Sequence, residues 1–228
     1  MWTANILTLF PDLYPGPLGS SILGDAKKKG IWDLNIVDIK LFSEKNKRVD
    51  DTPFGGGPGM VIKADVIDRA LFSIKSKNFP IYYLSPRGTK LNHEISESIS
   101  KLNGITLVCG KYEGVDERVI KHYNMIEISV GDYILSGGDL AAMVLIDSAV
   151  RYLPNVLGSP LTLDDETFIN NLLEYPLYTK PRKWKNYKVP EVLLSGNHKK
   201  IKNWKIKQSE AITMQRRPDL WKKYLKLK

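Results

Sequence analysis

Four segments of this 228-residue chain combine glycines with acidic or aromatic residues in patterns that can bind a ligand. They are VDDTPFGGGPGM at 49–60, YYLSPRG at 82–88, CGKYEGVDERV at 109–119 and SVGDYILSGGDLAAM at 129–143. Glycine permits close backbone approach, and three glycines in a row cost more conformational entropy than a simple turn requires. None of these segments matches the GxGxxG or GxxxxGK[ST] nucleotide motifs. We expect backbone N–H and C=O groups of the last three segments to bind a ligand such as an adenine ring.

Side chains that could catalyse a reaction are mainly carboxylates and arginines. His93, His122 and His198 are scattered, and Cys109 has no histidine near it in sequence, which disfavours covalent acyl chemistry and a structural zinc site. A carboxylate can accept a proton, and an arginine can stabilise a developing oxyanion. Residue types alone do not choose among Glu113, Asp116, Asp132, Asp139, Arg151, Asp164, Asp165 and Glu166.

The net charge of +9 is concentrated in the last quarter of the chain. Residues 175–228 hold 16 Lys and Arg against 3 Asp and Glu, a net of +13, which leaves 18 against 22, a net of −4, for residues 1–174. This asymmetry predicts contact between the C-terminal part and a polyanion, with nucleic acid favoured over a solvated basic face.

Strands and helices alternate through the first 157 residues. Short apolar runs predict strands, and helical periodicity follows each of them, so we expect an α/β domain with a mainly parallel sheet. The strands are expected at 5–10, 34–39, 81–85, 105–109 and 125–129, and the helices at 20–29, 64–75, 92–101, 116–122 and 139–152. Ligands of such sheets bind beyond the carboxyl ends of the strands, where three of the four segments lie.

The remaining chain divides into a linker and a small basic domain. Residues 158–170, with SPLTLDDET, lack periodicity and predict a mobile linker, and residues 171–228 predict helices at 198–217 and 219–226. A single cysteine, no signal peptide and no apolar run of about 20 residues favour a cytoplasmic protein without a membrane span.

Taken in order, the motifs resemble the bacterial tRNA (guanine-N1)-methyltransferase family, TrmD. DDTPFGGGPGM, YYLSPRG, LVCGKYEGVDERV, SVGDYILSGGDL, LPNVLG, PLYTKP and VPEVLLSGNHKKIKNWKIKQS carry the resemblance over nearly the whole chain. It implies an N-terminal domain tied in a deep trefoil knot of the SPOUT class, a rare exception to unknotted topology. It also implies a cytoplasmic homodimer with shared active sites, in which the linker and C-terminal domain of one chain complete the pocket of the other.

The resemblance further implies that S-adenosylmethionine lies bent in the knot, held by three loops. Carried over to this sequence, the cofactor-binding residues are Tyr83, Leu84, Ser85, Pro86, Gly110, Tyr112, Glu113, Val130, Gly131, Asp132, Tyr133, Ile134, Leu135, Gly137 and Gly138. Lys111 and Ala141 stand where the family commonly has Arg and Pro, and we expect both to be tolerated.

By the same resemblance, the reaction is methylation of N1 of the guanosine at tRNA position 37, with a requirement for Mg²⁺ but no protein metal ligands assigned. Glu166 takes the position of the family's catalytic Asp, Asp165 is the alternative base, and Arg151 corresponds to the arginine that supports the guanine oxygen. The basic helical domain 171–228 is expected to bind tRNA. The residues expected to bind the tRNA substrate are Asp50, Gly55, Gly56, Gly57, Pro58, Gly59, Ser195, Asn197 and His198.

Three alternatives stay open beside this interpretation. Another knotted methyltransferase could act on ribose 2′-hydroxyls, and the Glu at the catalytic position leaves room for a non-catalytic RNA-binding module. A dinucleotide dehydrogenase is disfavoured because no GxGxxG follows the first strand.

Overall fold

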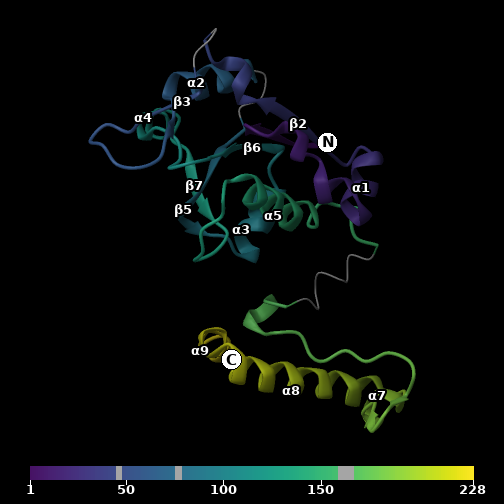
Figure 1. The fold of residues 1–228 in the computed structure, drawn as a ribbon. Helices are drawn as coiled ribbons and strands as arrows, with labels where there is room; N and C mark the ends of the chain where they lie inside the picture. Colours follow the sequence, from purple (N-terminus) through teal and green to yellow (C-terminus); the bar gives the residue numbers. More distant parts are fainter. Residues whose placement is uncertain (45–47, 75–78, 159–166) are drawn as a thin grey trace. The chain divides into compact units, whose positions relative to one another are not determined.

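The computed structural model describes residues 1–44, 48–74, 79–158 and 167–228. The chain divides into two compact units, Met1–Gly158 and Ser159–Lys228 (Figure 1). Residues 159–166, which make up most of the predicted linker, lie outside the described residues.

A five-stranded parallel sheet forms the centre of the N-terminal unit, in the order β2-β1-β6-β5-β7. Both faces of β1 are buried, as is typical of a strand covered on each side. The strands are β1 (Trp2–Thr8), β2 (Trp32–Asp38), β5 (Ile81–Lys90), β6 (Gly104–Cys109) and β7 (Ile126–Ser129).

Helices cover both faces of this sheet and enclose two apolar cores (Figure 1). α1 (Ser21–Lys28), α3 (His93–Ser100) and α5 (Asp139–Val150) pack on one face, where Trp32 and Ile146 are fully buried. α2 (Ala64–Ser73) and α4 (Glu117–His122) pack on the other. Three short 3-10 helices lie at Pro11–Leu13, Gly16–Gly19 and Ile39–Phe42.

Two local features depart from the expected elements. β5 runs five residues beyond the predicted end at Ser85, and its pairing with β7 shifts register between Leu84 and Thr89, so the motif SPRG forms a bulge inside the strand. The predicted loop 49–60 begins and ends in a small antiparallel hairpin of β3 (Asp50–Asp51) and β4 (Val61–Ile62).

The C-terminal unit is mostly helical. It contains a 3-10 helix (Ile169–Asn171), a hairpin of β8 (Lys183–Trp184) and β9 (Tyr187–Lys188), then α7 (Glu191–Leu194), α8 (His198–Arg216) and α9 (Pro218–Leu225). The amide side chain of Asn197 caps α8 by accepting the N–H of Lys200 at 3.0 Å. α8 packs against α9, and Thr213 inside α8 accepts the backbone N–H of Leu173 at 2.8 Å.

The α/β class, the mainly parallel sheet and the helical C-terminal region are thus confirmed. The expected strand 5–10 is wrong in its bounds, because β1 starts at Trp2 and ends at Thr8, before the 3-10 turn that Pro11 opens. Among the described residues, no helix is long and apolar enough to cross a membrane.

Candidate active site

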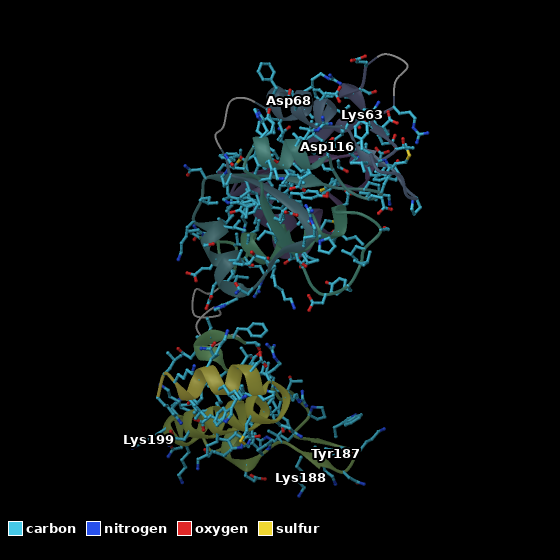
Figure 2. All side chains as sticks on the ribbon, turned by 90° about the vertical axis from the view of Figure 1, so that its left-hand side faces the viewer. Lys63, Asp68, Asp116, Tyr187, Lys188 and Lys199 are labelled. Atoms are coloured by element: carbon cyan, nitrogen blue, oxygen red, sulfur yellow. The ribbon has the colours of Figure 1, made fainter. Side chains whose placement is uncertain are left out.

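A cleft of about 1560 Å³ opens in the N-terminal unit beside the middle of β5 and beyond the carboxyl ends of β6 and β7. Its first three walls are the β5 residues 83–87, the segment 110–119 after β6 and the segment 130–138 after β7, and residues 51–54 and 61–65 form a fourth. Typical small-molecule sites measure about 300–1,000 Å³, so this cleft has room for more than one ligand. Lys63, Asp68 and Asp116, which Figure 2 labels, also line the cleft.

The second and third walls meet backbone to backbone at Gly137 and Gly138. The N–H of Gly138 donates to the carbonyl of Gly110 at 2.8 Å, and Lys111 pairs with Gly137 in a single antiparallel bridge. A Cβ on Gly138 would lie 2.9 Å from the Cα of Cys109, closer than real Cβ contacts come. Gly138 is therefore required by the close approach of a second segment of this chain, whatever ligand the cleft binds.

Tyr83 joins the first wall to the second. Its ring is buried, and its hydroxyl accepts the N–H of Val115 at 3.3 Å beneath Gly114. Burial raises the pKa of Tyr83, so this phenol stays protonated. Tyr83 acts as a fixed support under the loop 110–115.

Behind the cleft, a buried polar network ties α5 to β1 and β6. The carboxylate of Asp139, the first residue of α5, accepts hydrogen bonds from Thr8 Oγ1 at 2.5 Å and the Tyr14 hydroxyl at 3.2 Å. The same hydroxyl lies 3.6 Å from Cys109 Sγ. Burial raises the pKa of both Tyr14 and Cys109, so both are neutral near pH 7. The network fixes the backbone immediately after Gly138.

An ion-pair cluster holds the bulge of the first wall. Arg87 Nη2 lies 3.1 Å from Glu117 Oε2 on α4 and 3.1 Å from Glu127 Oε2 on β7. The hydrogen bond from Arg87 lowers the pKa of Glu117. These partly exposed pairs orient the bulge more than they stabilise the fold.

Three of the candidate carboxylates have structural partners. The Asp116 carboxylate caps α4 by accepting the N–H of Arg118, and the Arg118 guanidinium lowers the pKa of Asp116. Asp132 forms an ion pair with Lys90 at 2.6 Å. Asp139 is held in the buried network. Glu113 lines the cleft, and its backbone N–H donates to the carbonyl of Met60 at 3.0 Å.

The structure brings nearly all the predicted cofactor residues to one cleft. Fourteen of the fifteen line it, Asp132 being the exception. The predicted substrate residues are dispersed. Asp50 is buried and forms an ion pair with Arg48. Gly55, Gly56 and Gly57 have positive φ, and a Cβ added to any of them would meet no atom within 4 Å. Gly59 abuts the Glu113 side chain, Pro58 lies between these glycines outside the lining, and Ser195, Asn197 and His198 belong to the C-terminal unit.

The predicted catalytic residues do not converge within the described chain. Glu166 and Asp165, like Asp164, lie outside the described residues. Arg151 is half-buried at the carboxyl end of α5 and does not line the cleft. The roles of all three stay predictions.

Sequence reasoning missed three residues that shape the cleft: Thr8, Tyr14 and Arg87. Thr8 and Tyr14 lie far from the glycine-rich motifs in sequence, so no local signal pointed to them. Arg87 stands inside the motif YYLSPRG, and its charge beside a strand end could have suggested a pairing role. No group of three His, Cys, Asp or Glu in the part of the chain that the structure describes could hold a metal ion.

Comparison with known proteins decides the family. A model of the family described as tRNA (Guanine-1)-methyltransferase TrmD matches residues 1–223. The chain belongs to this family. A protein of Pelagibacter ubique (strain HTCC1062) named tRNA (guanine-N(1)-)-methyltransferase is 53% identical over 227 residues, covering 99% of this chain and 100% of the relative.

Other relatives carry the same name. One from Ehrlichia canis (strain Jake) is 53% identical over 220 residues, 95% of this chain and 94% of its own. One from Ruegeria sp. (strain TM1040) is 48% identical over 228 residues, 98% and 93% respectively. The predictions of TrmD membership and of an enzyme are confirmed.

Proposed function

We propose that this chain transfers the methyl group of S-adenosylmethionine to N1 of guanosine 37 in tRNA. The observation that carries the proposal is the cleft itself, since three separate motifs of the TrmD pattern line it together at the strand ends. The names of the relatives and the basic C-terminal unit support tRNA as substrate.

The residues of the cleft fit such a cofactor. Ile134 and Leu135 supply apolar surface for a purine ring, beside the segments 110–113 and 130–138. Because Gly137 and Gly138 lie flat against 109–111, their peptide groups are held rigidly at the cleft wall. When bound, the sulfonium cofactor supplies an electrophilic methyl group.

Proton removal is assigned to the chain's own carboxylates. N1 of guanine carries a proton that must leave as the N–CH₃ bond forms, and we assign its acceptance to Glu166, with Asp165 as the alternative. Arg151 is assigned to the negative charge that develops on O6. A glutamate keeps the charge of the family's aspartate on a longer side chain.

We further infer a homodimer in which each site uses residues of both chains. α5 is 12 residues long, about 18 Å at 1.5 Å per residue, so Arg151 is far along the helix from Gly138. An arginine so distant is better placed to serve the cleft of a second copy. Leu140 and Val144, 56% and 49% exposed, form an outward apolar stripe on α5 that a second copy would cover.

Three finer expectations belong to the same proposal. Gly138, in the segment after β7, donates its N–H to the carbonyl of Gly110, directly after β6. This return of the chain to the end of β6 supports the deep trefoil knot. A cytoplasmic location follows from the tRNA substrate. The Mg²⁺ requirement rests on family resemblance alone.

The test is single-turnover methylation of a tRNA transcript carrying guanosine at position 37, with an adenosine-37 transcript as control. Labelled cofactor should produce 1-methylguanosine only in the first transcript. Glu166→Gln should abolish the chemical step while Asp165→Asn retains it, and the reverse result would move the base to Asp165. A 2′-O-methyl product would establish the ribose methyltransferase, and binding without product would establish the RNA-binding module.

A further inference from the structure

The β8–β9 hairpin, residues 183–188, exposes two aromatic rings at one end of the C-terminal unit. Trp184 and Tyr187 are cross-strand partners, 60% and 74% exposed, with ring centroids 6.3 Å apart and planes inclined by only 21°. Figure 2 shows Tyr187 and Lys188 projecting from this end. Two exposed aromatic rings side by side, unlike single ones, form an apolar patch of the kind that marks interaction sites.

The same hairpin carries charge that nothing nearby neutralises. Residues 175–190 hold five cations and no Asp or Glu, and within the described chain none of the five forms an ion pair. They are Lys180, Arg182, Lys183, Lys185 and Lys188. Residues 177–188 are exposed throughout. The surface is therefore strongly positive and open to a polyanion.

Two details of the hairpin oppose its own stability. Lys183 lies directly opposite Lys188, and like charges facing each other across strands destabilise a sheet. Lys185 at the turn has φ of 51°, a conformation that glycine or asparagine adopts more readily. In this conformation, Lys185 Nζ lies 4.8 Å from the centroid of the Trp184 ring. An anion bound here would relieve the repulsion between the lysines.

We propose that the 183–188 hairpin is an RNA-binding surface, whose aromatic pair stacks on unpaired bases while its lysines neutralise adjacent phosphates. Strands place residues 183 and 188 on one face and 184 and 187 on the other, so the ribbon offers a charged side and a stacking side. Aromatic stacking combined with cationic side chains is how proteins bind single-stranded nucleic acid without sequence preference. RNA as the partner rests on the proposed function, and the hairpin shares no residue with the lining of the cleft.

Binding of a short fluorescein-labelled oligouridylate and of a tRNA transcript tests the proposal directly. Trp184→Ala and Tyr187→Ala should each weaken both complexes about tenfold, and Trp184→Phe should retain most of the affinity. Converting Lys183, Lys185 and Lys188 to Gln should flatten the dependence of log K on log salt by about 0.7–0.9 per lysine. Lys29→Gln, an exposed lysine of the N-terminal unit, should leave that slope unchanged.

Methylation kinetics with tRNA complete the test. The hairpin variants should raise KM for tRNA more than they lower kcat, because saturating tRNA offsets weaker binding and no hairpin residue lines the cleft. Wild-type affinity in Trp184→Ala, or binding of the hairpin to phosphatidylserine vesicles in place of RNA, would overturn the proposal. If the protein binds RNA through the hairpin but methylates no tRNA, the proposed function fails and the hairpin assignment stands.

Discussion

The contact between Gly138 and the end of β6 makes Gly138→Ala the most informative single substitution. The new Cβ would lie 2.9 Å from Cys109 Cα and 3.0 Å from the N of Gly110. Because carbon atoms pack at about 3.5–4.0 Å, the two backbones must separate by roughly half an ångström. Backbone atoms cannot swing away as a side chain can, so the displacement reaches the whole segment 130–138.

The expected cost combines two effects. Overpacking of this kind destabilises proteins by about 1–3 kcal/mol. Moving the segment also weakens the 2.8 Å hydrogen bond from Gly138 to Gly110, worth about 0.5–1.5 kcal/mol. We therefore expect a loss of about 2–4 kcal/mol in the free energy of unfolding, a large share of an ordinary protein's 5–15 kcal/mol.

Two other alanine substitutions make a graded control series. The Cβ of Gly137→Ala would lie 3.2 Å from the flexible Lys111 side chain and 3.3 Å from the Gly110 carbonyl oxygen. We expect this variant to lose about 1 kcal/mol in the free energy of unfolding. Gly158→Ala meets no atom within 4 Å and should change stability by less than about 0.5 kcal/mol. Urea unfolding followed by tryptophan fluorescence measures the stability of each variant. Calorimetric titration with S-adenosylmethionine measures the affinity of its cleft for the cofactor. If Gly138→Ala unfolds at the same urea concentration as Gly158→Ala, the packing argument is refuted.

Three further predictions use the residues around the cleft. Burial raises the pKa of Cys109, so the thiol of the unfolded chain ionises at a lower pH than the thiol of the folded protein. The free energy of unfolding should therefore fall by about 1.4 kcal/mol per pH unit above roughly pH 8.5. Urea titrations should show a smaller fall in Cys109→Ala, and an equal fall would contradict the role of Cys109. Asp139→Ala leaves the Thr8 and Tyr14 hydroxyls without their acceptor and should cost about 2–4 kcal/mol in thermal or urea unfolding, whereas Asp139→Asn should cost less because it keeps an oxygen there. Arg87→Gln should lower stability by less than about 1 kcal/mol but weaken cofactor binding measured by calorimetry, and unchanged affinity would show that the bulge needs no such support.

Much of the N-terminal fold could be predicted because its elements follow simple patterns. A short run of mostly apolar residues, several of them β-branched, predicts the strand 105–109, and β6 is buried at every position. Convergence of the motifs on one cleft followed from the rule that ligands bind beyond the carboxyl ends of parallel strands.

The rest depended on contacts that local patterns do not encode. SPRG contains a proline and a glycine, which predict a turn, yet tertiary pairing with β7 keeps it within the strand as a bulge. The β8–β9 hairpin has two-residue strands, too short for a periodic signal, and two of its four strand positions are lysines. The hydrogen bonds of Tyr14 reach Asp139, 125 residues away in sequence.

The position of β1 in the sheet has a consequence for synthesis on the ribosome. β1 pairs with β2 on one side and with β6 on the other, and the side chains of Asn5 and Thr106 bond across 101 residues of chain. At about 5–20 residues per second, β6 emerges roughly 5–20 s after β1. Throughout that interval one edge of an entirely buried strand lacks its partner, and such an edge is a template for pairing with other chains. A nascent chain that stalls before Gly104 is therefore an aggregation hazard, and its sheet cannot serve as a smaller folded domain.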